Sequence, residues 1–173
     1  MEIAFLSPNS IRIKGKQGIL MVDPGVSGAK QTADVVVVLQ ASDAHKNFAV
    51  EGARLMIYGV GDYEVANIKI TSNSFAGELV HAIRIDGASV TIGSAKALSG
   101  LAEQLNETQI LVVRAGDSLG QAVTALGPRV LVLYGEGATE DAKNFGKEGL
   151  TPVGKYVISA EKLPQDMEVV LLG

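Results

Sequence analysis

Three runs of consecutive apolar residues constrain the fold of this chain most. They are Val35–Leu39, Ile110–Val113 and Val130–Leu133, and each follows a charged or polar residue. Apolar runs as short as these are typical of β-strands, and their lack of alternation indicates strands that are covered on both faces. The chain therefore has to place protein layers on each side of a sheet.

The other apolar segments predict a strand-rich first half and a mixed second half. Further strands are predicted at Ile3–Leu6, Ile11–Ile13, Ile19–Val22, Leu55–Tyr58, Ile68–Ile70, Leu79–Ile85, Val90–Ile92 and Glu168–Leu172, and helices at Lys96–Leu105, Leu119–Leu126 and Glu140–Phe145. This order indicates an α/β protein, a four-layer αβ/βα sandwich of two mixed β-sheets with outer helices. No linker or repeat divides the chain, so we expect residues 1–173 to form one domain.

The composition excludes several classes of function. The chain has no cysteine, which rules out disulfides, thiolate metal sites and a cysteine nucleophile, and which agrees with a cytoplasmic location. The formal net charge is -4 and the 15 Lys and Arg residues are scattered, so we expect no nucleic-acid partner. No basic segment precedes the apolar N-terminus and no apolar stretch approaches about 18 residues, so we expect no targeting segment and no membrane association.

A series of short motifs runs along nearly the whole chain. The motifs are Ser10–Ile13 with Gly18–Gly25, Ala33–Leu39, Gly59–Val65 with Ile68–Ile70, Ile85–Ser94, and Leu163–Leu171. In this order and spacing the chain resembles the metallo-β-lactamase fold superfamily, and specifically its UlaG-like branch of small predicted zinc-dependent hydrolases. The resemblance implies a metallo-β-lactamase-like fold with a metal-binding loop directly after Leu39.

The metal ligands of that family do not carry over to this chain. Its His-x-His-x-Asp-His cluster falls on Gln40, Ser42, Ala44 and His45, its later His-Leu-Gly-Asp falls on Thr91, Ile92, Gly93 and Ser94, and its last histidine falls among Tyr134, Gly135 and Glu136. A catalytic zinc site usually takes three protein ligands, whereas the chain has two histidines in total, His45 and His81. The resemblance therefore implies a degenerate site with no metal, no other cofactor and no catalytic residue.

The residues at and around these positions define a candidate vestigial pocket. It consists of Asp23, Gln40, Ser42, Asp43, His45, Asp62, Tyr63, Thr91 and Ser94. In one interpretation His45 and Asp43 hold a single metal together with a carboxylate from the turn at residues 62–64. In the other, which we favour, Asp43 caps a short helix that starts near Ala44.

Two more residues have alternative roles. The family's aspartate at the position of Asp23 hydrogen-bonds the metal loop, so Asp23 either braces the loop at residues 40–45 or simply ends a strand in an Asp-Pro-Gly turn. His81 lies in a predicted strand without an acidic neighbour in sequence, which favours a surface or strand histidine over a metal ligand.

The missing ligand set predicts a non-catalytic binding or structural module whose partner is an unknown protein or a small-molecule ligand. The alternative is a hydrolase of the same superfamily with an unconventional single-metal or metal-free site around His45. The segments Met1–Leu6 and Glu168–Leu172 are candidate sheet edges, through which a homodimer would form.

Overall fold

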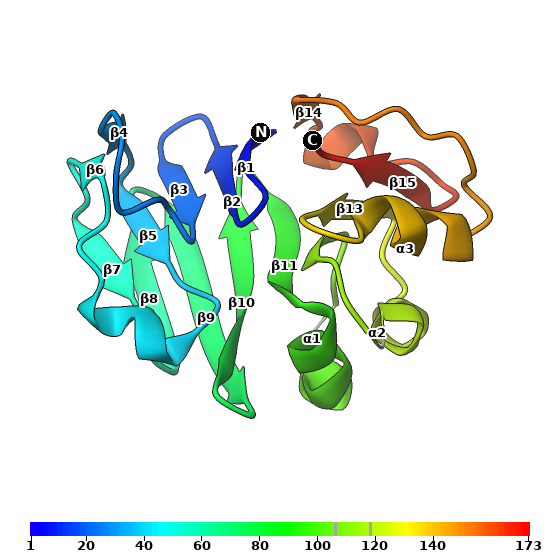
Figure 1. Ribbon diagram of the computed structural model, residues 1–173, viewed down its shortest axis with the longest axis horizontal. Coiled ribbons are helices and arrows are strands. Elements are labelled where there is room, and N and C mark those ends of the chain that lie inside the picture. The colour runs from blue at the N-terminus through cyan, green and yellow to red at the C-terminus, as the bar shows by residue number, and fades with distance from the viewer. Residues whose placement is uncertain (106, 118) are drawn as a thin grey trace.

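The computed structural model describes residues 1–105, 107–117 and 119–173, with His45 described by its backbone. Two large β-sheets face each other, and the strands from the first third of the chain lie in front of the strands from its middle in Figure 1. A two-stranded sheet of β4 (Gln31–Thr32) and β6 (Val50–Glu51) lies at one side of the molecule. None of the helices in these ranges combines the length and the apolar character that crossing a bilayer requires.

The first sheet has the strand order β14-β1-β2-β3-β5-β7. Its strands are β1 (Glu2–Ser7), β2 (Ser10–Lys14), β3 (Ile19–Val22), β5 (Val35–Val37), β7 (Leu55–Ile57) and β14 (Lys155–Val157). The strands from β14 to β3 pair antiparallel, whereas β3, β5 and β7 run parallel. The sheet is therefore mixed.

The second sheet has the strand order β15-β13-β12-β11-β10-β9-β8. Its strands are β8 (Gly61–Val65), β9 (Ile68–Phe75), β10 (Glu78–Ile85), β11 (Ala88–Ser94), β12 (Ile110–Arg114), β13 (Val130–Tyr134) and β15 (Glu168–Leu171). Successive antiparallel hairpins connect β8, β9, β10 and β11. Strands β11, β12, β13 and β15 pair parallel. The carboxyl ends of β11, β12 and β13 consequently lie at one edge of the sandwich.

The side chains of the continuous runs divide between two apolar layers. In β5, Val35 and Val37 face the second sheet in the central core, whereas Val36 packs on the outside against Phe48. In β12, Val112 joins the central core while the alternate residues face the helices. Both faces are covered, as the lack of alternation predicts.

In the described ranges, three α-helices cover the second sheet, namely α1 (Ala95–Leu101), α2 (Leu119–Leu126) and α3 (Ala138–Asn144) (Figure 1). Short 3-10 helices lie at η1 (Ala41–His45), η2 (Ala102–Gln104) and η3 (Ala160–Lys162). The outer face of the first sheet is covered by η1 and by the segment around Phe48, in place of an α-helix. The predicted α/β sandwich of two mixed sheets is confirmed, with its α-helical layer on the second sheet.

The two predicted sheet edges have different surroundings. Strand β1 is an interior strand, because β14 pairs with its free side, so the expectation of an edge at Met1–Leu6 is wrong. Strand β15 does end the second sheet, and a bridge between Val153 and Leu172 covers part of it. The homodimer stays a prediction.

His81 joins the two sheets. It lies on β10, is completely buried, and has a contact of 2.9 Å between Nε2 and the Val38 carbonyl oxygen at the end of β5. A carbonyl only accepts, so Nε2 carries the proton, and Nδ1 accepts from the Ser72 hydroxyl at 2.7 Å. Burial lowers the pKa of His81 from 6.5 to about 4, so the ring is neutral at pH 7. His81 is a strand histidine, as expected, and one buried in the core rather than at the surface.

Candidate functional site

Polar residues gather where parallel strands of the two sheets end. Asp23 directly follows β3, and Gln40 follows the run that contains β5. In the second sheet Ser94, Arg114 and Tyr134 are register partners across β11, β12 and β13, each at the carboxyl end of its strand. Side chains at the carboxyl ends of parallel strands converge, which makes this edge the candidate site.

Glu78 ties two of the predicted pocket residues together. Its Oε1 accepts a hydrogen bond of 2.9 Å from Gln40 Nε2, and its Oε2 accepts one from the Ser94 hydroxyl. The Ser94 hydroxyl also accepts from the Ala97 backbone N–H and so caps α1. The loop after β5 is therefore fastened to the second sheet through the Glu78 carboxylate.

The backbone reinforces this attachment. Gln40 and Glu78 form an isolated β-bridge, the Leu79 N–H donates to the Leu39 carbonyl at 2.9 Å, and the Ala41 N–H donates to the Gly77 carbonyl at 3.3 Å. Glu78 begins β10 just after a hairpin turn, and nothing in its sequence neighbourhood marks it as a site residue. Its role follows only from the pairing of distant segments.

Asp23 makes polar contacts with both sheets. Its Oδ1 accepts a hydrogen bond of 2.9 Å from the Leu39 N–H, and its Oδ2 accepts one of 3.2 Å from Arg114 Nη1. Burial raises the pKa of Asp23 to about 6, against the opposing effects of the Leu39 N–H and the Arg114 charge. The bracing interpretation predicts a contact between Asp23 and the loop at residues 40–45, and the hydrogen bond from Leu39 lies one residue before that loop. The hydrogen bond from Arg114 connects Asp23 to the second sheet as well.

Tyr134 contributes a buried hydroxyl beside this ion pair. The residue is completely buried, and its hydroxyl has no hydrogen-bond partner among the residues that the structure describes. Burial raises the pKa of Tyr134, the charge of Asp23 adds to the increase, and the charge of Arg114 opposes it. The hydroxyl is therefore protonated and lies within the electrostatic influence of both charges.

A hollow of about 400 Å³ opens next to the ion pair. Asn9, Asp23, Asp43, Lys46, Phe48 and Arg114 are among the residues that line it. Asp43 lies inside η1, and its Oδ2 contacts Lys46 Nζ at 2.7 Å. The capping interpretation of Asp43 is wrong, because the helix starts at Ala41 and the Asp43 carboxylate pairs with a lysine side chain instead of a backbone N–H.

The other predicted pocket residues lie apart from this cluster. Asp62 and Tyr63 belong to the edge strand β8 rather than to a turn; Asp62 accepts from the Thr71 hydroxyl, and the Tyr63 hydroxyl contacts the carbonyls of residues 59 and 60. Thr91 pairs with the Thr108 hydroxyl at 2.8 Å. Since the neighbours of Thr91 in β11 point into the central core, its own side chain points to the opposite face.

The last two predicted pocket residues, Ser42 and His45, belong to η1. Ser42 is exposed on η1. The side chain of His45, the predicted centre of an unconventional site, lies outside the described residues.

The described side chains do not fit the metal site that the resemblance implies. Among the described residues no group of three His, Asp or Glu is arranged to hold a metal ion. Gln40 and Ser94 are bonded to Glu78, His81 is bonded to Ser72 and Val38, and Arg114 adds a permanent positive charge at the same strand ends. A cation would meet side chains that are already hydrogen-bonded within the protein, and the positive charge of Arg114.

The fold has close counterparts among solved structures. A Thermotoga maritima protein assigned to the zinc-dependent hydrolases of the metallo-β-lactamase superfamily aligns over 99% of this chain and 98% of its own, with a TM-score of 0.76 and 16% identity. The chain has the metallo-β-lactamase fold. This shared architecture extends over essentially the whole chain, from β1 to β15.

Two other structures with this fold are similar at lower scores. A Parabacteroides distasonis protein assigned as a metal-dependent hydrolase matches at TM-score 0.60 and 13% identity, over 99% of this chain and 93% of its own. An isothiocyanate hydrolase from Delia radicum gut bacteria matches at TM-score 0.62 and 10% identity, over 92% and 100% of the two chains. No family model and no curated protein sequence matches the chain. The TM-scores support the metallo-β-lactamase fold. At identities this low, any activity has to be inferred from the residues of the site and not from the fold.

Replacing Glu78 by alanine is expected to lower the free energy of unfolding by about 2 kcal/mol, because Gln40 and Ser94 lose their shared acceptor in a partly buried position. Urea unfolding followed by circular dichroism measures the effect. The control is Glu64→Ala on the exposed edge strand β8, which is expected to change stability by less than about 0.5 kcal/mol. Equal effects of the two changes would show that the Glu78 contacts contribute nothing special.

Proposed function

We propose that this chain is a non-catalytic binding module on the metallo-β-lactamase fold, of the UlaG-like type with a degenerate metal site. The observation that carries the proposal is the Glu78 carboxylate, which bonds to Gln40 and Ser94. By the resemblance, these two residues stand where the family has a histidine and a carboxylate ligand. The hydrogen bonds of Glu78 hold both positions in contacts within the chain itself.

The chemistry of the remaining groups supports the same proposal. Hydrolysis in this superfamily depends on a metal that lowers the pKa of a bound water to near neutrality. Here Arg114 supplies a positive charge at the strand ends, but a guanidinium has no open coordination position and cannot generate hydroxide at pH 7. Both carboxylate oxygens of Asp23 accept hydrogen bonds, from the Leu39 N–H and from Arg114, so Asp23 braces the start of the loop.

A hollow is nevertheless retained beside these strand ends. Its volume of about 400 Å³ lies within the range of small-molecule sites, and its charged residues can bind the polar groups of a ligand. A module that serves only as a structural subunit gains nothing from such a hollow. This favours ligand binding over a purely structural role.

Metal content tests the proposal directly. We expect protein purified without a metal-binding tag to contain negligible zinc or manganese by elemental analysis, and to give no binding heat with either ion at millimolar concentration in calorimetry. A stoichiometric metal that is lost in His45→Ala but kept in the exposed-residue control Lys69→Ala would overturn the proposal. It would instead support a hydrolase with an unconventional site around His45.

A further inference from the structure

We infer that the hollow beside Arg114 binds a small molecule through a single carboxylate group, with the Arg114 guanidinium as its receptor. The inference rests on the proposed function and names the ligand class of that binding module. It is carried by a guanidinium with uncommitted donors, by the charges around it, and by a buried hydroxyl in an adjoining hollow.

Arg114 has hydrogen-bonding capacity to spare. A guanidinium carries five N–H donors in a planar fork. Within the described ranges, the hydrogen bonding of this side chain is limited to one contact of 3.2 Å from Nη1 to Asp23 Oδ2. The side chain is 21% exposed and lines the hollow, so its remaining donors are accessible to a ligand. A planar fork of this kind matches the two oxygens of a carboxylate.

The acidic groups of the hollow are already engaged. Both oxygens of Asp23 accept hydrogen bonds, from Leu39 and from Arg114, and Asp43 pairs with Lys46 at 2.7 Å. What the hollow still offers is therefore mainly donors, on Arg114 and on the half-exposed ammonium of Lys46. This arrangement selects an anion.

The same charges limit how negative the ligand can be. Two acids and two bases line the hollow, Asp23 and Asp43 against Arg114 and Lys46, so their formal charges cancel. A second negative charge on the ligand would lie close to the two carboxylates without a free cation to balance it. A monoanionic carboxylate is accordingly favoured over a phosphate dianion.

An adjoining hollow indicates the rest of the ligand. A space of about 170 Å³ shares Ser7, Pro24 and Gly25 with the first hollow and is also lined by Ser10 and Gln31. The Ser10 hydroxyl is buried and has no hydrogen-bond partner among the described residues. Buried hydroxyls are normally paired, so this one suits a ligand with a hydroxyl group of its own. A hydroxycarboxylate could bind the Arg114 guanidinium with its carboxylate in the first hollow and the Ser10 hydroxyl with its own hydroxyl in the second.

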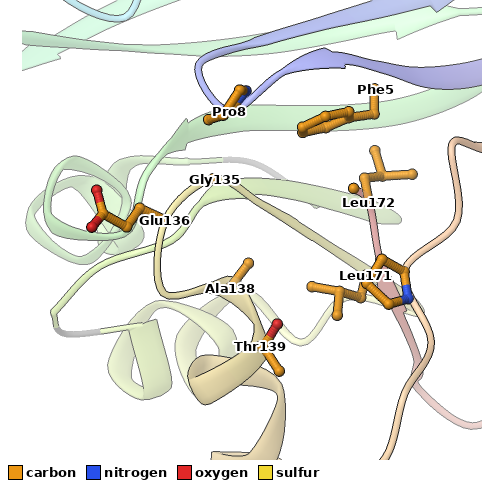
Figure 2. A pocket seen from close by; sticks show the side chains of 10 residues that line it. Phe5, Pro8, Gly135, Glu136, Ala138, Thr139, Leu171 and Leu172 are labelled. Carbon is orange, nitrogen blue, oxygen red and sulfur yellow. The ribbon is translucent and has the colours of Figure 1, made fainter.

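Another hollow of about 400 Å³ serves as an internal contrast (Figure 2). Phe5, Leu171 and Leu172 give it an apolar wall beside β13 and β15, and Glu136 on its rim is acidic. None of the described residues that line it is a lysine or an arginine. A carboxylate would find no cation among the described residues there, so the charged hollow is the one assigned.

The test is calorimetric titration in metal-depleted buffer with the monocarboxylates lactate and gluconate, and with the dicarboxylate malate, gluconamide and inorganic phosphate as contrasts. We expect at least one carboxylate to bind with a Kd of about 1 mM or tighter, and gluconamide not to bind. Arg114→Lys keeps the charge beside Asp23 but loses the fork, and is expected to weaken binding about tenfold. The control Arg54→Lys, at an exposed ion pair with Asp34, is expected to leave the Kd unchanged.

Three results would overturn the inference: no carboxylate binding up to 10 mM, tighter binding of phosphate than of every carboxylate, or an unchanged Kd in Arg114→Lys. Unfolding curves of both variants establish that they are folded. Failure here is distinguishable from failure of the proposed function. Absence of metal together with absence of carboxylate binding refutes only the inference, whereas carboxylate binding that requires added zinc refutes the proposed function.

Discussion

Replacing His81 by alanine is expected to lower the free energy of unfolding by about 3 kcal/mol or more. The change opens a cavity in the fully buried space between the sheets, and it leaves the Ser72 hydroxyl and the Val38 carbonyl without their partner. The cost of the cavity persists because the protein interior relaxes only partly around a missing side chain, and the cost of the two unpaired polar groups adds to it. Urea unfolding at pH 7, followed by circular dichroism, measures the loss.

Two variants calibrate the effect of His81. Ser72→Ala removes only the donor to Nδ1 and is expected to cost about 1–2 kcal/mol. Arg84→Ala changes an exposed residue on the same strand β10 and is expected to stay within about 0.5 kcal/mol of the wild type. A loss below about 1 kcal/mol in His81→Ala would contradict the role of this residue as a link between the sheets.

The second large effect concerns the pH dependence of stability. The folded-state pKa of His81 lies near 4, below its ordinary value of 6.5, so its contribution to stability is complete above pH 6.5 and is lost as the pH falls toward 4. The folded-state pKa of Asp23 lies near 6, above its ordinary value of 3.8. The folded state therefore takes up the Asp23 proton first, and this contribution to stability grows as the pH falls from 6 to 3.8. Each change amounts to about 3 kcal/mol, with opposite signs.

Asp23→Asn separates these two opposing contributions. The variant loses the gain at low pH but keeps the penalty from His81. Between pH 7 and pH 4, we therefore expect its free energy of unfolding to fall by about 3 kcal/mol more than that of the wild type. Other carboxyl groups titrate alike in both proteins, so they cancel in the difference. Parallel pH profiles for the two proteins would contradict the raised pKa of Asp23.

His81→Gln provides the complementary profile. It removes the titrating ring, so its stability is expected to fall less than that of the wild type over the same pH range. Measuring unfolding of the three proteins in urea at several pH values between 4 and 7 assigns each contribution to its residue. A wild-type profile identical to that of His81→Gln would show that folding does not lower the pKa of the ring.

The sequence was a good guide to the strands and a partial guide to the site. The runs at Val35–Leu39 and Ile110–Val113 form strands covered on both faces, because only such strands accommodate consecutive apolar side chains. Strand β8 was predicted as a turn, since its Gly-Asp-Tyr-Glu sequence at an exposed edge has little apolar character.

Of the predicted pocket residues, the structure brings Asp23 and Asp43 to one hollow and links Gln40 to Ser94 through Glu78. Thr91 turned out to face the helices, because alternation along β11 sends every second side chain to the opposite face. Arg114 could have been found, since it is the charged residue that ends a buried parallel strand, at the edge where such strands place their functional groups.

By itself, the sequence determined which segments form covered strands and how few histidines the chain can offer. Apolar patterning is a local property that decides the strands, and two histidines are too few for the metal site that the resemblance implies. Only the tertiary structure decided that Glu78 bonds to Gln40 and Ser94, and that Arg114 and Asp23 form an ion pair across 91 positions of the chain. Such contacts form only where donor and acceptor atoms from different strand ends come within about 3 Å of each other. Which strand ends are neighbours follows from sheet pairing rather than from closeness in the sequence.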